Sequence, residues 1–237
     1  MQISEILKDS IIYPTKSIKS SSIFMILGII VGIFSVMALN LEMFEGSLNT
    51  GIKIVLMMIV LLMSLVMFFL TQGYSLDILR QSIQKSDQTP SFNISRQLSN
   101  SRKILVVNIV YFILPSIISF FLGLILQLWI VPLLGVFISI IFFLATTMAE
   151  CRLAKTGKLL NALNIVGTIR DINAIGFEKV FVTILTISIV MIMSVIAVLA
   201  ISWYFSSQIL TSVLIGILGV YLLFFSKRAM GLLYSER

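Results

Sequence analysis

Six long stretches of this chain are apolar and contain no Asp, Glu, Lys or Arg. A helix needs about 20 mostly apolar residues to cross the ~30 Å hydrocarbon core of a bilayer, whereas the strands of a membrane barrel are short and alternate in polarity. The continuous runs therefore predict an all-α fold, a polytopic membrane bundle of six transmembrane helices. The predicted spans are Ser22–Leu41, Ile54–Thr71, Ile104–Leu126, Trp129–Ala149, Val180–Ile201 and Gln208–Ser226.

Composition excludes a water-soluble fold and several kinds of chemistry. Hydrophobic residues make up 59% of the chain and charged residues 11%, against roughly 45–50% and 25% in soluble domains. The chain has no His and a single Cys, Cys151. The usual ligands of zinc, haem and iron–sulfur sites are therefore missing, and no disulfide can form within one chain. We expect no metal site and no cofactor.

The basic residues predict the orientation of the spans. Of the 17 Lys and Arg residues, three precede the first span, five lie between the second and third, five between the fourth and fifth, and three follow the sixth. Only Lys53 falls on the opposite side. Because short loops rich in Lys and Arg stay in the cytoplasm, we predict a multi-pass plasma-membrane protein with both termini cytoplasmic.

The spans group into three similar units, about 1–73, 74–157 and 158–237, within a single membrane domain. Each unit is predicted to be an amphipathic cytoplasmic helix followed by a helical hairpin. The apolar residues of the first and third helices lie at helical spacing, and the middle segment is weaker and rich in Ser and Asn. These residues are Ile3, Ile6, Leu7 and Ile11 in the first helix, and Leu159, Leu163, Val166 and Ile169 in the third.

The amphipathic helices either lie on the membrane surface or cap the bundle from the cytoplasmic side. The second and fourth spans are expected to continue as helices past the membrane, to about Ile83 and Gly157. Basic residues beside the spans are candidates for contact with anionic headgroups, each worth ~1 kcal/mol near a charged surface. These candidates are Lys16, Lys19, Arg102, Lys103 and Lys179.

One face of the third span is polar. Asn108, Tyr111, Pro115 and Ser119 follow helical spacing, and Pro115 frees a backbone carbonyl and kinks the helix. Such a face lines a small cavity for a lipid or apolar solute, or bonds to neighbouring helices, and we favour the second.

Pairs of small residues four apart serve internal helix packing or dimerisation, and we favour internal packing. They are Gly28/Gly32, Ser119/Gly123, Gly135/Ser139 and Ser212/Gly216.

Several short motifs resemble a known family. They are Glu5-Ile6-Leu7-Lys8-Asp9-Ser10 with Tyr13-Pro14, Gly73-Tyr74 with Asp77-Ile78-Leu79-Arg80, Thr89-Pro90-Ser91-Phe92, Ala154-Lys155-Thr156-Gly157 with Asn161-Ala162-Leu163, and Ile175-Gly176-Phe177-Glu178-Lys179. Over nearly its whole length the chain resembles the archaeal membrane proteins grouped as domain of unknown function forty-thirteen. It departs from them at Ser86-Asp87-Gln88, where they usually carry an acidic, glycine-containing linker. The resemblance implies a multi-span archaeal plasma-membrane protein and brings no known activity.

The function classes narrow accordingly. No predicted span carries an ionisable residue, which argues against a proton- or sodium-coupled carrier. No acid–base, nucleophile or metal constellation is visible, so we expect no enzyme. We predict a non-catalytic scaffold, assembly or lipid-contacting component that meets anionic headgroups, with a homo-oligomer or membrane-protein partner and no nucleic acid. The alternative is a transporter or pore for an uncharged or lipid-like solute, supported by the three-fold repeat and the polar face around Asn108.

Overall fold

The structure is a computed structural model that describes residues 2–16, 18–39, 50–125 and 130–237. These residues form helices joined by short connections and contain no strand. The helices are α1 (Ile3–Lys16), α2 (Ile18–Leu39), α3 (Thr50–Ile83), α4 (Ile94–Ile125), α5 (Ile130–Thr156), α6 (Leu159–Leu163), α7 (Ile165–Ile175), α8 (Phe177–Phe205) and α9 (Gln208–Tyr234).

Five of the described helices are long and apolar enough to cross a membrane, namely α3, α4, α5, α8 and α9. The number rises to six if α1 and α2 are taken together as one bent span. The prediction of an all-helical, multi-span fold is confirmed. The first predicted span falls on α2, and its last residues lie outside the described residues. The last residue of the third predicted span and the first residue of the fourth also lie outside them.

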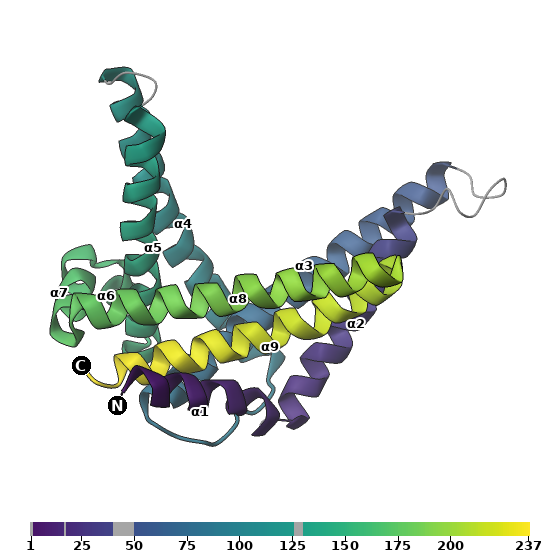
Figure 1. Cartoon of the computed structure of the whole chain (residues 1–237), viewed down its shortest axis with the longest axis horizontal. Helices are drawn as coiled ribbons and strands as arrows, with labels where there is room; N and C mark the ends of the chain where they lie inside the picture. Colours follow the sequence, from purple (N-terminus) through teal and green to yellow (C-terminus); the bar gives the residue numbers. More distant parts are fainter. Residues whose placement is uncertain (1, 17, 40–49, 126–129) are drawn as a thin grey trace.

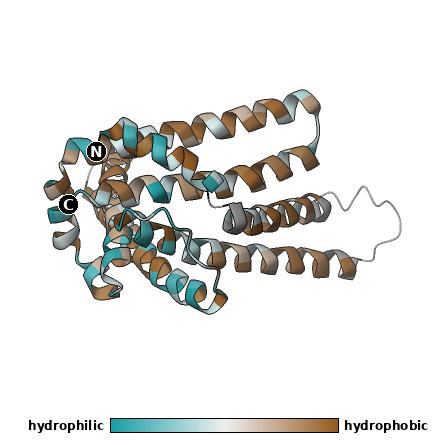
Figure 2. Ribbon diagram, turned by 90° about the horizontal axis from the view of Figure 1, so that it is seen from below, coloured by the Kyte–Doolittle hydropathy of each residue, from teal (hydrophilic) through white to brown (hydrophobic). Residues whose placement is uncertain are grey.

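The helices form two arms that diverge from one end of the molecule (Figure 1). One arm consists of α4 and α5 side by side, and the other of α2, α3, α8 and α9. Both termini lie where the arms meet, and Figure 2 shows hydrophilic residues gathered there. We call this region, made of α1 and residues 84–103, 150–179 and 227–237, the polar end.

Glycines allow close contact between α2 and α9. A Cβ atom added at Gly28 would lie 2.7 Å from the backbone oxygen of Gly216, and one at Gly32 would lie 2.7 Å from the backbone oxygen of Ser212. Two of the predicted small-residue pairs thus face each other across this crossing. The prediction that they serve internal packing is confirmed for these four residues, because only such short side chains let two backbones approach so closely in lipid.

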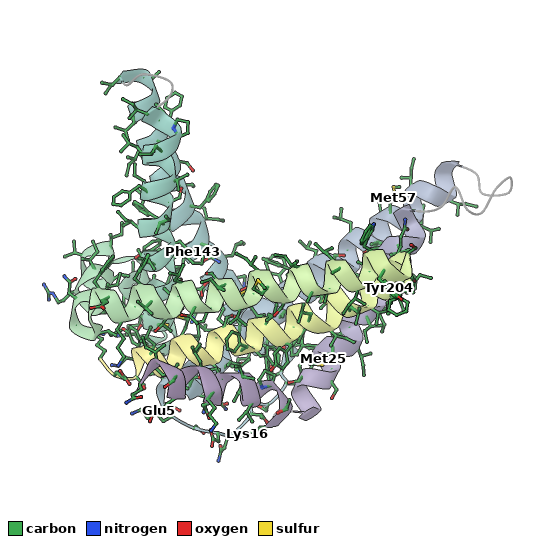
Figure 3. The ribbon with its side chains drawn as sticks, viewed as in Figure 1. Glu5, Lys16, Met25, Met57, Phe143 and Tyr204 are labelled. Atoms are coloured by element: carbon green, nitrogen blue, oxygen red, sulfur yellow. The ribbon has the colours of Figure 1, made fainter. Side chains whose placement is uncertain are left out.

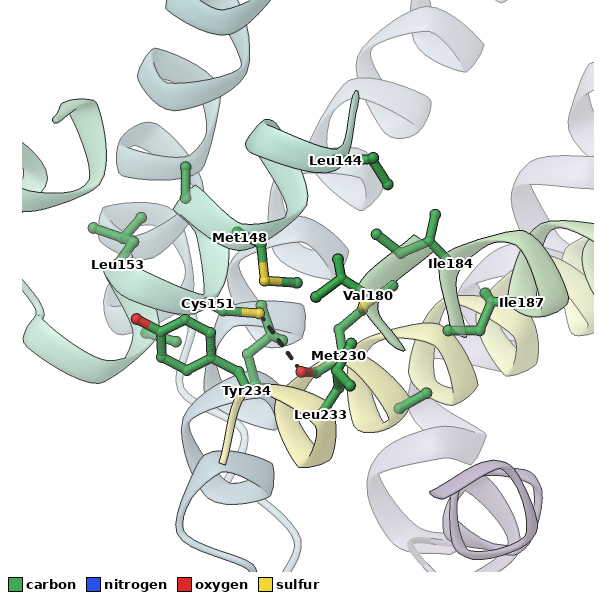
Figure 4. Close-up of a cluster of buried hydrophobic side chains, with 14 of the residues drawn as sticks. Leu144, Met148, Cys151, Leu153, Val180, Ile184, Ile187, Met230, Leu233 and Tyr234 are labelled. Atoms are coloured by element: carbon green, nitrogen blue, oxygen red, sulfur yellow. Dashed lines mark hydrogen bonds between the residues drawn. The ribbon is translucent and has the colours of Figure 1, made fainter. Parts of the chain in front are cut away.

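Apolar side chains are buried mainly near the polar end and stay exposed along the arms. Figure 4 shows Met148, Cys151, Val180 and Met230 among a buried cluster where α5, α8 and α9 meet. Farther out, side chains such as that of Tyr204, which is 81% exposed, project from the arms (Figure 3). This distribution suits a protein in lipid, where no hydrophobic effect drives apolar groups between the helices.

Arg228, near the C-terminal end of α9, bonds to both α1 and the 84–93 connection. Its side chain is only 3% exposed. The guanidinium donates to Asp9 at 2.8 Å, to Asp87 at 2.6 Å and to the backbone oxygen of Ser86 at 2.6 Å. A buried guanidinium needs several acceptors, because its five N–H donors have lost their hydrogen bonds to water.

Asp171 of α7 forms a second ionic cluster in the polar end. It is fully buried and accepts a hydrogen bond from Tyr234 of α9 at 2.7 Å. Arg152 of α5 and Arg237 lie 3.4 and 2.8 Å from its carboxylate oxygens. One carboxylate therefore ties α7 to α5 and to the C-terminus.

The predicted amphipathic helix of the third unit is in fact two helices. The chain breaks at Asn164, whose side-chain oxygen accepts from the backbone N–H of Gly167 at 2.9 Å and so caps α7. The break divides the predicted apolar stripe: Leu159 and Leu163 pack against the core, whereas Val166 and Ile169 are 69% and 47% exposed.

The middle unit also differs from the prediction, because no separate helix precedes it among the described residues. Asn93 caps α4 by accepting from the backbone N–H of Arg96 at 3.0 Å, and α4 then continues unbroken from Ile94 into the span. No Gly or Pro lies between Ile94 and Lys103 to interrupt it. The predicted continuations of α3 to Ile83 and of α5 to the Gly157 region are confirmed.

Candidate functional site: a cleft between the two arms

A cleft of about 840 Å³ lies between the arms. Residues of α4 and α5 form one wall, and residues of α8 and α9 the other. Figure 3 shows Phe143 where α5 faces α8. The lining is mainly apolar and includes Phe112, Phe142, Phe143, Ile184, Ile187 and Met191.

All four residues of the predicted polar face line this cleft, namely Asn108, Tyr111, Pro115 and Ser119. Tyr111 is 1% exposed, and its hydroxyl donates to the backbone oxygen of Ala162 at 3.0 Å and lies 3.0 Å from the hydroxyl of Thr168. This phenol thus bonds α4 to α6 and α7, as the packing alternative predicts. Asn108 differs, because its side-chain oxygen is buried and has no hydrogen-bond partner among the described residues.

Further hydroxyls of the cleft escaped the sequence reasoning because they lie within apolar runs and form no polar stripe. Ser139, Thr146 and Thr147 of α5 and Ser188 of α8 line the cleft. The hydroxyls of Thr146 and Thr147 donate at 2.7 and 2.8 Å to carbonyls one turn earlier in their own helix. They therefore add little polarity to the cleft.

An ion pair lines the cleft at the polar end. Glu150 of α5 and Lys227 of α9 line the cleft and bond directly to each other, with side chains 8% and 14% exposed. In the sequence each is the first charged residue after a predicted span. The predicted fourth and sixth spans end on the same side of the membrane, so Glu150 and Lys227 are expected at a similar depth. This shared depth is the sequence signal that could have predicted the ion pair.

Three of the five predicted lipid-contacting residues are already engaged within the protein. Lys16 lies 3.9 and 3.8 Å from the carboxylates of Asp9 and Asp87. Lys103 donates to a backbone carbonyl at 3.2 Å. Lys179 forms an ion pair with a carboxylate near the C-terminus.

That carboxylate belongs to Glu236, and Lys179 stabilises its charged form. Burial raises the pKa of Glu236, but hydrogen bonds and nearby positive charge, those of Lys179 first among them, together outweigh burial and lower the pKa overall. Arg102 is exposed and has no partner among the described residues. The side chain of Lys19 lies outside the described residues. Of the predicted set, Arg102 is the described cation left to meet a headgroup.

Comparison with known proteins yields one match. The sequence model of a family described as "Protein of unknown function (DUF4013)" matches residues 56–203. This range holds the cleft walls on α4, α5 and α8 and stops before α9. No curated protein and no solved structure matches the chain.

Proposed function

This chain belongs to the family of proteins of unknown function DUF4013, and from that premise we propose that it is a non-catalytic lipid-binding protein of the plasma membrane. The observation that carries the proposal is the cleft between the arms. It is long and mostly apolar, and the charged residues of its described lining, Glu150 and Lys227, lie together at the polar end. A lipid has the same division into an apolar chain and a polar head.

The length of the cleft suits an extended hydrocarbon chain. Its lining on α5 extends from Ser139 to Glu150, which is about 16 Å at 1.5 Å per residue. Water does not fill an apolar space of this kind well, because each water needs two to four polar partners. A hydrocarbon chain matches the walls instead, and ligand sites of roughly 300–1,000 Å³ with few polar groups are common in proteins.

The polar groups of the cleft favour binding over catalysis. Glu150 and Lys227 bond to each other, and the phenol of Tyr111 bonds to the backbone. The threonine hydroxyls of α5 donate within their own helix. A serine or threonine nucleophile needs a base beside it to become reactive, and these hydroxyls face carbonyls instead.

We further propose that both termini lie in the cytoplasm. All Lys and Arg residues except Lys53 flank the spans on the side of the two termini, and basic short loops stay inside. Single cysteines at Ser91 and Ser206, both exposed, test this in a Cys151→Ser background. A membrane-impermeant thiol reagent should label the Ser206 position from outside and the Ser91 position only from inside, and the reverse pattern would show the opposite orientation.

The lipid itself is tested with a matched pair of tryptophan substitutions. Ser188 lines the cleft, and Ile192, one turn farther along α8, is 58% exposed. Native mass spectrometry of detergent-purified protein should show one retained lipid for wild type and Ile192→Trp, and none for Ser188→Trp. Equal retention by the two variants would exclude the cleft as the lipid site.

A transporter of a lipid-like solute is the second candidate. The observation that favours it is the division into two arms around the cleft (Figure 1), since carriers rock one bundle against another around a bound solute. Transfer of a fluorescent lipid between the leaflets of reconstituted vesicles, compared for wild type and Ser188→Trp, separates the two. Transfer that depends on an open cleft supports a transporter, and retention without transfer supports a binding protein.

A further inference from the structure

We infer that the ligand of the cleft has a net-neutral polar head that carries both a hydrogen-bond donor and an acceptor, and that Glu150 and Lys227 bind this head. The inference rests on the proposed lipid-binding function and names the class of lipid. Of the described residues that line the cleft, only these two are charged. They come from opposite walls, α5 and α9, and pair with each other at the polar end.

The ion pair keeps bonding capacity for a further partner. A lysine ammonium has three donors and a carboxylate has two oxygens that each accept. Among the described residues, each of these two side chains makes a single hydrogen bond, which joins Lys227 to one carboxylate oxygen of Glu150. Two ammonium donors and the second carboxylate oxygen therefore stay available to a ligand in the cleft.

Burial makes this ion pair costly for the fold. Its side chains are 8% and 14% exposed, so both ions have lost most of their hydration. Replacing a buried ion pair with apolar residues of similar volume is often neutral or stabilising. A ligand head that bonds to both ions compensates for the lost water and gives the pair a function.

Asn108 offers a third polar group near this end of the cleft. Ser119 of α4 faces Gly135 of α5, with 3.8 Å between the serine oxygen and a Cβ built on the glycine. Since α4 and α5 run antiparallel (Figure 1), Asn108 falls level with Thr146, about 6 Å or one turn from Glu150 along the helix. Its buried, unpartnered oxygen is an acceptor that a donor on the ligand head would satisfy.

The charges of the pair sum to zero, and this selects the head. A net-anionic head placed against Lys227 also meets Glu150, and a net-cationic head against Glu150 also meets Lys227, so each gains one attraction and one repulsion. A zwitterionic head with N–H donors, or a neutral hydroxyl head, bonds to both ions without repulsion. Specificity against the other heads then comes from the unfavourable contact.

Delipidated protein in detergent provides the test, with three lipids that have identical acyl chains. They are phosphatidylethanolamine, phosphatidylglycerol and a cationic diacyl trimethylammonium lipid, and bound lipid is counted by native mass spectrometry. We expect wild type to bind the ethanolamine lipid about tenfold more tightly than either other lipid, a difference of about 1.4 kcal/mol. The double variant Glu150→Gln/Lys227→Gln keeps a polar side chain at both positions without its charge and should bind all three lipids alike.

Two single variants complete the design. Glu150→Gln leaves the ammonium unpaired and should favour phosphatidylglycerol, and Lys227→Gln leaves the carboxylate and should favour the cationic lipid. If wild type binds one lipid molecule per protein but has the same affinity for all three head groups, this inference fails and the proposed function stands. If wild type retains no lipid, the proposed function fails as well. A preference that survives in the double variant would assign head selection to other residues.

Discussion

Gly216→Ala tests whether glycines set the distance between α2 and α9. The new Cβ would lie 2.6 Å from the carbonyl carbon and oxygen of Gly28 and 3.0 Å from the nitrogen of Ile29. These are backbone atoms, which cannot turn away as a side chain does. Ordinary contact begins at 3.4 Å, so the helices must separate locally by about 0.8 Å.

The cost follows from that separation. A gap of 0.5–1 Å removes a quarter to a half of the dispersion energy of each contact, and overpacking in a close-packed interior typically costs about 1–3 kcal/mol. We expect Gly216→Ala to lower the free energy of unfolding by about 2 kcal/mol. For a chain of this size, at about 2–4 °C per kcal/mol, the melting temperature should fall by about 4–8 °C.

Gly219→Ala is the matched control, one turn farther along α9. A Cβ there has no atom within 4 Å, and alanine is a better helix former than glycine by about 0.5–1 kcal/mol. Stability is measured by circular dichroism during unfolding in SDS mixed micelles and by heating. The reasoning is refuted if the two variants unfold at the same SDS fraction and temperature.

Three further predictions concern Arg228, Tyr111 and α7. Arg228→Met should destabilise the protein by about 2 kcal/mol, since hydrogen bonds to charged groups are worth about 1.5–3 kcal/mol, whereas Arg102→Met, at an exposed site, should leave the melting temperature unchanged. Tyr111→Phe should cost about 1 kcal/mol through the lost hydrogen bond without changing lipid retention. A nitroxide at Val166 should be relaxed more by lipid-soluble oxygen than by an aqueous nickel chelate, and one at Lys158 the reverse. Equal accessibility at the two sites would place the apolar side of α7 away from the bilayer.

The sequence was sufficient to identify five to six helices long and apolar enough to cross a membrane, because the bilayer fixes the length of a span and removes charges from it. Small residues four apart also predicted packing, but they did not reveal which pairs meet. Gly28 and Gly32 lie opposite Ser212 and Gly216, and this pairing joins residues nearly two hundred positions apart. Hydropathy is a local property, so it contains no information about such contacts.

The ion pair that lines the cleft was missed for a related reason. A predicted span ends at the first charge, so Glu150 and Lys227 were placed just past the fourth and sixth spans and nothing linked them to each other. The helices α5 and α9 continue past those positions and bring the two side chains together. Depth in the membrane depends on how helices tilt and on what surrounds them, and neither is written in the composition of a segment.

The orientation of α7 shows a deeper limit of pattern reading. In water an amphipathic helix turns its apolar stripe toward the core, but the apolar residues of α7 divide. Ile172 packs in the core, whereas Val166 is 69% exposed, and the polar Thr168 and Asp171 are fully buried. Near a membrane both arrangements are open to a helix, because its apolar side can face lipid. The polar side is then free to make the specific bonds, and Asp171 makes them to Tyr234 and Arg237.

The same logic explains why the polar end controls the cleft. Along the arms, apolar contacts between helices compete with equally apolar lipid, so the specific bonds that fix the helices gather where the arms meet. Helix α9 takes part in both regions: Lys227 lines the cleft, and its neighbour Arg228 holds α1 and the 84–93 connection. A change that releases Arg228 therefore acts on the helix that carries one half of the ion pair. Stability and lipid binding should respond together at Arg228, and only stability should respond at Tyr111, whose hydroxyl bonds away from the cleft to α6 and α7.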